Sequence, residues 1–198
     1  MIAARAAWKP AHGVFLVLLI PTVVVWASAE VRQAVKLRPE ATRAGWGSEV
    51  VLRVTAVAGA LVAALAVAKV PAADIRPEAL AAWLGLLFLW CDVALRIWCF
   101  HTLGRYFTLT VRTSSDQPVI ADGPYRVLRH PSYTGILLAV IGLGLFIGNC
   151  LSVLALAAGF TIGLVYRIRV EERALLKDLG DRYREYAAMR KRLIPFVW

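Results

Sequence analysis

The stretch from Asp122 to Gly135, DGPYRVLRHPSYTG, gathers side chains capable of chemistry in an otherwise apolar part of the chain. It contains two arginines, one histidine, two tyrosines and two prolines. The prolines interrupt helix formation, because proline lacks a donor N–H and restricts the residue before it. Non-helical backbone at a membrane face is tolerated where protein buries it or where it lines a wet cavity. We therefore interpret this stretch as the wall of a polar pocket.

A second polar group lies at the end of the last apolar segment, where the sequence reads YRIRVEE. On a helix, Arg167 and Glu171 share one face, whereas Glu172 is turned by about 100°. Taken alone, the Arg167–Glu171 pair is explained as a surface ion pair just past the membrane, which contributes little stability. The pair becomes more informative when its position relative to the first polar stretch is considered.

A tight hairpin joins the two apolar segments that carry these polar groups. The residues predicted to meet at one membrane face are Tyr125, His130, Tyr133, Arg167 and Glu171. Arginine can hold a carboxylate bidentately, and glutamate can accept hydrogen bonds from an ammonium group or a ribose. Aromatic rings can flank a purine or face a cation. The combination predicts a site for a charged, partly aromatic small molecule.

The composition places the chain in a membrane. Of 198 residues, 60% are hydrophobic, and the mean hydropathy is +0.65, which is too apolar for an ordinary soluble domain. The net charge of +10 would suit nucleic acid, but the positive charge flanks apolar segments, as in membrane proteins. We therefore exclude a nucleic-acid partner.

The three cysteines, Cys91, Cys99 and Cys150, lie in or beside apolar runs without a CxxC motif. We therefore expect buried free thiols and neither a disulfide framework nor a metal site.

Apolar segments define the elements that must position the site. They are Gly13–Ala29, Ser48–Ala68, Ala79–Phe100, Thr134–Gly148 and Leu151–Ile168. The fourth is shorter than the ~20 residues of a straight crossing, so a re-entrant segment is an alternative there. The tail Arg169–Met189 has amphipathic helical spacing. We predict an all-α integral membrane protein with about five transmembrane helices and a C-terminal amphipathic cytoplasmic helix. The final LIPF is expected to fold back against the pocket or the interface.

Charge distribution predicts the orientation in the membrane. The first loop, the connector His101–Tyr133 and the C-terminal tail hold most of the lysines and arginines. The positive-inside rule then places the pocket in the cytoplasm and the N-terminus outside. Within the third segment, Asp92 and Arg96 share a helix face. Ionisable groups at this depth often mark pockets, so this pair is interpreted either as a structural pair or as support for the pocket.

The polar motifs resemble those of the isoprenylcysteine carboxyl methyltransferase family, in a short prokaryotic-type form. The matching pattern is GPYRVLRHPSYTG, a hairpin, RIRVEERALL, LGDRYREY and a closing LIPF, which together cover Leu95 to Phe196. The resemblance implies a membrane methyltransferase that uses S-adenosylmethionine, held in a cytoplasmic pocket under the C-terminal helix. It also implies one membrane domain over residues 1–198, with three spans in 1–100 and the cofactor-binding catalytic half in 101–198. A bacterial inner membrane is the expected location.

The resemblance also assigns roles to individual residues. Arg167 would be catalytic and would orient the carboxylate that is methylated. A glutamine found upstream in the family appears here as Thr110, and the match of the segment that begins at Gln117 is positional only. The implied cofactor-binding residues are Gln117, Pro118, Val119, Ile120, Tyr125, His130, Pro131, Ser132, Tyr133 and Glu171.

The methyl acceptor is left open by the sequence. A carboxylate is already ionised at neutral pH and needs no general base, whereas a thiol or a phospholipid amine would need one, with His130 or Glu171 as candidates. We expect a lipophilic or lipidated acceptor, prenylcysteine-like or otherwise, which enters sideways from the membrane lipid.

Two alternatives to a methyltransferase are weaker. A sterol-reductase-like enzyme using NADPH would usually have more spans and a basic cluster for the 2′-phosphate, and a non-enzymatic scaffold would not explain why these residue types converge.

Overall fold

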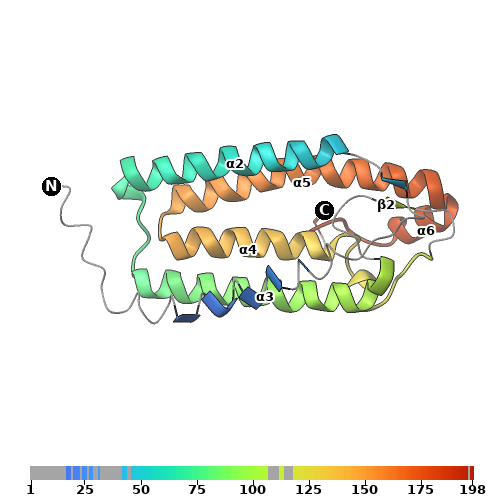
Figure 1. Cartoon of the computed structure of the whole chain (residues 1–198), viewed down its shortest axis with the longest axis horizontal. Helices are drawn as coiled ribbons and strands as arrows, with labels where there is room; N and C mark the ends of the chain where they lie inside the picture. The colour runs from blue at the N-terminus through green and yellow to red at the C-terminus, as the bar shows by residue number, and fades with distance from the viewer. Residues whose placement is uncertain are drawn as a thin grey trace.

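Helices arranged side by side form the body of the protein in the computed structural model (Figure 1). The long helices are α2 (Trp46–Lys69), α3 (Glu78–Leu103), α4 (Pro131–Ile147) and α5 (Cys150–Leu179). They lie in the order α2, α5, α4, α3, so that each packs on its neighbour in this row. The structure describes residues 17–18, 20–22, 24–25, 27–28, 31, 42–43, 46–106, 112–113, 118–195 and 197–198.

The apolar helices establish a multi-pass membrane protein. Among the described residues, Gly47–Lys69, Glu78–Leu103 and Cys150–Leu179 are long and apolar enough to cross a bilayer, and Pro131–Ile147 is a shorter apolar helix. This agrees with the predicted short fourth segment. The described positions between residues 17 and 31 are all helical, and the rest of the predicted first span lies outside the described residues. The division of the chain at residue 100 stays a prediction.

Short elements connect the helices. They are the two-residue strands β1 (Thr42–Arg43) and β2 (Arg112–Thr113), the 3-10 turns η2 (Pro71–Ala73), η3 (Gly104–Tyr106) and η4 (Gly123–Arg126), and the helix α6 (Asp181–Ala188). The two strands pair antiparallel, with Thr42 opposite Thr113. The first loop and the long connector are therefore at the same end of the helices, as the alternation of spans predicts.

The hairpin between α4 and α5 forms as predicted. Gly148 ends α4 in the left-handed conformation, with φ of 79°, which glycine adopts without steric cost. Asn149 then caps α5, because its side-chain oxygen accepts a hydrogen bond from the amide of Ser152 at 3.1 Å. The same side chain donates to Asp74 Oδ1 at 3.0 Å and so ties the hairpin to the loop between α2 and α3.

Two sequence predictions are corrected here. The amphipathic tail was predicted as one helix over Arg169–Met189, but its first part continues the fifth apolar segment within α5, which runs to Leu179, and its second part is the separate helix α6. A run of charged residues contains no helix breaker, and the helix ends only at Gly180, whose φ is 58°. The cysteines are free, but only Cys99 is buried, because Cys91 and Cys150 lie on the outer surface of the helices.

Glycines set the close contact between α2 and α5. A Cβ on Gly159 would lie 2.5 Å from the carbonyl oxygen of Thr55, and one on Gly59 would lie 2.7 Å from that of Ala155. Small residues allow helices to approach this closely in a membrane. Gly59, in the second apolar segment, therefore has a packing role.

We predict that Gly159→Ala destabilises the protein by roughly 1–3 kcal/mol, because the added methyl overpacks the backbone of α2. Thermal unfolding of the detergent-purified protein measures this change. Gly47→Ala is the matched control, since a Cβ there meets nothing within 4 Å, and we expect it to be neutral or slightly stabilising. Equal stability of both variants would contradict the tight α2–α5 contact.

Candidate functional site

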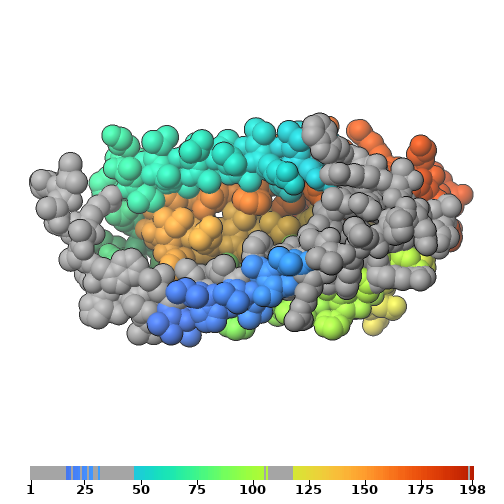
Figure 2. All heavy atoms as spheres, in the orientation of Figure 1, coloured from blue at the N-terminus to red at the C-terminus, as the bar shows by residue number. Residues whose placement is uncertain are grey.

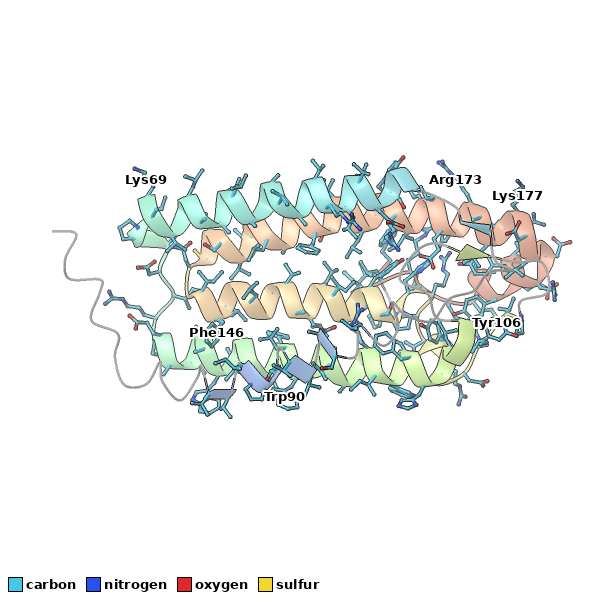
Figure 3. The ribbon with its side chains drawn as sticks, in the orientation of Figure 1. Lys69, Trp90, Tyr106, Phe146, Arg173 and Lys177 are labelled. Carbon is cyan, nitrogen blue, oxygen red and sulfur yellow. The ribbon has the colours of Figure 1, made fainter. Side chains whose placement is uncertain are left out.

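The polar residues gather at one end of the row of helices. The N-terminus of α4, the C-terminal part of α5 and the helix α6 meet there (Figure 1). In Figure 3, Arg173, Lys177 and Tyr106 mark this end, whereas Lys69 lies at the opposite end. The two polar motifs, distant in sequence, therefore face each other as expected.

The prolines of the first motif define its backbone. His130 is the N-cap of α4 and Pro131 is its first residue. The first N–H groups of a helix have no partner within the helix, so the missing N–H of Pro131 costs nothing there. Gly123, with φ of 53°, starts η4, and a Cβ there would lie 2.7 Å from Thr102 Oγ1. The stretch is thus non-helical before Pro131, as predicted, and is held close to the end of α3.

The Tyr133 hydroxyl joins α4 to α5. It donates a hydrogen bond to Glu171 Oε2 at 2.6 Å and accepts one from Arg167 Nε at 2.8 Å. The Arg167 guanidinium carbon also lies 5.8 Å from the centre of the Tyr133 ring. Arg167 is only 4% exposed, so its charge interacts with neighbouring side chains rather than with water. Arg167 and Glu171 share a face as predicted, and they meet through this phenol.

His130 completes this group. Its ring stacks on that of Tyr133, with centroids 5.5 Å apart and an interplanar angle of 6°. Its Nδ1 lies 4.0 Å from Glu171 Oε2, and its Nε2 lies 3.3 Å from Glu172 Oε1. The structure therefore brings into direct contact Arg167, Tyr133, Glu171 and His130, which are four of the five residues predicted to converge; Tyr125 is the fifth.

Glu172 is the site residue that sequence reasoning missed. It is buried, and its carboxylate oxygens contact Arg129 at 2.8 Å and Arg192 at 2.9 Å in addition to His130. Helical periodicity places Glu172 on a different face of the helix from Arg167, so the sequence did not predict it as a site residue. The signal that could have found it is the pair of adjacent glutamates beside an excess of arginines, since a buried carboxylate requires cationic partners.

The other predicted residues lie around this group. Tyr125 is buried, and its hydroxyl forms a hydrogen bond with the Cys99 thiol of α3. Burial raises the pKa of Tyr125 well above its usual value, so the phenol stays protonated. Its carbonyl oxygen accepts a hydrogen bond from Tyr186 of α6 at 3.0 Å. Tyr125 thus connects the site to α3 and α6.

The segment ahead of Tyr125 is described only in part. Val119 packs against the cluster of Leu179, Tyr183 and Tyr186, and Ile120 is half-buried, whereas Pro118 is exposed. Gln117 and Thr110 lie outside the described residues. Contacts of this segment with a cofactor stay a prediction.

The first turn of α4 rests on a buried ion pair. Arg96 Nε lies 3.9 Å from Asp92 Oδ1, and Arg96 donates to the carbonyl of Ser132 at 3.4 Å. A Cβ on Gly135 would lie 2.6 Å from Asp92 Oδ1. The contact of Arg96 with the first turn of α4 favours the second of the two interpretations, in which the pair supports the wall that carries Tyr133. Pro131 and Ser132 are buried in that wall.

No group of three or more histidine, cysteine, aspartate or glutamate side chains within the described ranges is arranged to hold a metal ion. The functional groups that converge at Tyr133 are instead one guanidinium, one phenol, one imidazole and one carboxylate. Such a set can bind a zwitterionic or cationic molecule and can orient a carboxylate.

Part of the chain is similar to known proteins. Residues 83–177 match the model of the isoprenylcysteine carboxyl methyltransferase family. The chain is 32% identical over 115 residues to protein-S-isoprenylcysteine O-methyltransferase B of Arabidopsis thaliana, which covers 57% of this chain and 58% of the relative. It is 34% identical over 116 residues to the Saccharomyces cerevisiae protein-S-isoprenylcysteine O-methyltransferase, covering 58% of this chain and 48% of the relative.

A solved structure shows the same architecture. The eukaryotic intramembrane Ras methyltransferase ICMT matches with a TM-score of 0.55 and 27% identity, over 73% of this chain and 52% of that chain. The chain thus spans between about half and three-fifths of the length of these relatives. The matched segment contains Tyr133, Arg167, Glu171 and Glu172, and over this segment the chain is similar to the isoprenylcysteine carboxyl methyltransferase family.

Proposed function

We propose that this protein is a membrane methyltransferase that uses S-adenosylmethionine and methylates the carboxylate of a lipophilic, prenylcysteine-like acceptor. The observation that carries the proposal is the Tyr133 hydroxyl, which links Arg167 and Glu171 beside the ring of His130. The family of the matched segment supports a methyl donor and a lipidated substrate.

The functional groups present suit this cofactor. S-adenosylmethionine supplies an electrophilic methyl group on a sulfonium and carries an ammonium, a carboxylate, a ribose and an adenine ring. The Glu171 carboxylate can accept from an ammonium or from ribose hydroxyls, and the stacked rings of His130 and Tyr133 offer aromatic surface. We assign cofactor binding to these three residues, with Tyr125, Pro131 and Ser132 as the wall that positions them.

Arg167 is assigned to the acceptor. Its planar guanidinium is a bidentate partner for a carboxylate, and the bond from its Nε to Tyr133 fixes its plane. An acceptor carboxylate is ionised at neutral pH, so the chain has to orient it and exclude water. Catalysis would then arise from positioning and from electrostatic preorganisation in a buried site. For a thiol or amine acceptor, His130 or Glu171 would act as base.

The lipophilic character of the acceptor is supported by the surroundings of the site. The site lies at the end of apolar helices whose outer faces expose large hydrophobic side chains. Figure 2 shows a hollow between α2 and the described positions of residues 17–31, with α4 and α5 visible at its floor. Sideways entry of a lipid tail along these helices fits this shape. We place the site on the cytoplasmic side, because the positively charged segments gather at its end of the helices.

Ligand binding separates the methyltransferase from the reductase alternative, which none of the similar proteins named above favours. We predict that S-adenosylhomocysteine raises the unfolding temperature of the detergent-purified protein. At a ligand concentration of 100 times Kd the stabilisation is about 2.7 kcal/mol. NADPH is expected to have no effect. Stabilisation by NADPH alone would overturn the proposal.

Tyr133→Phe tests the central hydroxyl. We predict that it weakens S-adenosylhomocysteine binding by roughly 10- to 100-fold, because a buried carboxylate and a buried guanidinium each lose a hydrogen bond. Isothermal titration calorimetry measures the affinity. The matched control is Tyr166→Phe, which removes an exposed hydroxyl from the residue next to Arg167. An affinity equal to that of the control would contradict the assigned role of Tyr133.

Arg167→Lys tests the assignment to the acceptor. Lysine keeps the charge but loses the planar fork, so we predict a fall in acceptor kcat/KM of at least about 100-fold. The affinity for S-adenosylhomocysteine should change much less, and Arg167→Ala should abolish transfer. Arg169→Lys, an exposed arginine on the same helix, is the control. Full activity of Arg167→Ala on a carboxylate acceptor would remove this role.

A further inference from the structure

Three segments of the chain converge on the carboxylate of Glu172. Its Oε1 accepts a hydrogen bond from Arg129 at 2.8 Å and lies 3.3 Å from His130 Nε2. Its Oε2 accepts from Arg192 Nε at 2.9 Å. Glu172 belongs to α5, Arg129 and His130 to the loop before α4, and Arg192 to the C-terminal segment. Both oxygens of one buried side chain are thus used to hold two other parts of the protein.

The C-terminal segment lies along this loop. The amides of Arg129 and His130 donate to the carbonyls of Lys191 and Arg192 at 2.8 and 3.0 Å. Arg129 Nε donates to the Arg190 carbonyl at 3.0 Å.

The same arrangement continues into α4. Thr134 Oγ1 donates to the carbonyl of Leu193 at 2.6 Å, and the Leu193 side chain is buried. The segment 190–193 therefore covers the backbone from which His130 and Tyr133 project.

Charge explains why Glu172 is needed there. Arg129 and Arg192 approach the same small volume, and without a carboxylate between them two guanidinium groups would repel each other in a partly buried place. Removing one member of a buried ion pair leaves the remaining charge uncompensated, which is strongly destabilising locally. Loss of Glu172 would accordingly release Arg192 and the segment attached to it.

The same carboxylate decides which nitrogen of His130 carries the proton. An ionised carboxylate only accepts hydrogen bonds, so the nitrogen that faces it, Nε2, is the donor. In the neutral ring, Nδ1 then holds the lone pair and lies on the side of Glu171, 4.0 Å from Oε2. The Glu171 carboxylate and the imidazole nitrogen thus form a pair of acceptors, which suits a ligand group that brings several donors.

We propose that Glu172 is a positioning residue of this site: it holds the C-terminal segment 190–193 closed over the loop, and it fixes the Nε2–H tautomer of His130. The lone pair of Nδ1 then accepts, together with Glu171, from the ammonium or ribose hydroxyls of the bound cofactor. Glu172 acts through His130 and Arg192 rather than on the reacting atoms. The cofactor part of this inference rests on the proposed function.

The test uses the full chain in detergent and two spectroscopic readouts. The chain has three histidines, so a His12→Asn and His101→Asn background leaves His130 as the single ¹⁵N-histidine signal. We expect the Nε2–H tautomer with Glu172 and a mixed or inverted population in Glu172→Gln, because an amide can donate as well as accept. Hydrogen exchange at the amides of Arg129 and His130 should accelerate by at least about tenfold.

Binding provides a third readout. The Kd of Glu172→Gln for S-adenosylhomocysteine should rise by roughly tenfold, whereas kcat at saturating cofactor should fall less, because the reacting groups are untouched. The matched control is Glu185→Gln, which neutralises an exposed glutamate of α6 and should leave all three readouts unchanged.

Arg192→Gln separates the two parts of the inference and serves if Glu172→Gln does not fold. This variant removes only the ion pair between Arg192 and Glu172. Hydrogen exchange at the amides of Arg129 and His130 should therefore accelerate, while the tautomer of His130 is retained. Unchanged exchange in Arg192→Gln, or an unchanged tautomer and unchanged exchange in Glu172→Gln, would overturn the inference. The tautomer and exchange measurements require no methyl transfer, so failure of the original protein to bind S-adenosylhomocysteine would defeat the proposed function alone.

Discussion

One hydroxyl group holds the site together. The phenol of Tyr133 donates to Glu171 and accepts from Arg167, so a cation and an anion on successive turns of α5 are both fixed to α4. A hydrogen bond to a charged group in a buried place is stronger than its counterpart in water, and its loss leaves charges without partners. The relative position of α4 and α5 at this end therefore matters for every side chain in the site.

The opposite end of the two helices sets that relative position. Gly148 and Asn149 make a tight turn, and a Cβ on Gly144 would lie 2.7 Å from the Cα of Val153, so the helices leave the turn in close contact. Because α4 is short and α5 is long, α5 extends past the start of α4. That overhang carries Arg167, Glu171 and Glu172 to the loop before α4. A short helix thus has a functional consequence, since it lets polar groups of its longer neighbour reach the pocket wall.

A membrane environment explains why charged side chains of opposite sign lie beside one another at this site. Ionisable side chains near the bilayer are costly unless they face a pocket or one another. Here the ion pair of Asp92 and Arg96 packs against the first turn of α4, and Glu172 contacts Arg129 and Arg192. The group of Tyr133, His130, Arg167 and Glu171, which we assign to ligand binding, lies next to both. Each supporting carboxylate lies beside at least one arginine, and we assign the central group to the recognition of a charged ligand.

The sequence by itself determined the class of protein, the non-helical polar stretch, the hairpin and the meeting of His130 and Tyr133 with Arg167 and Glu171. These features depend on composition, on prolines and glycines, and on helical periodicity, all of which are local. The tertiary structure alone decided the partners of Glu172 and the contact of Tyr125 with α3. Periodicity tells which face of a helix a side chain occupies, but it does not tell what lies opposite that face. Arg192 and Arg129 come from segments far from Glu172 in the chain, so only the folded backbone brings these charges to one carboxylate.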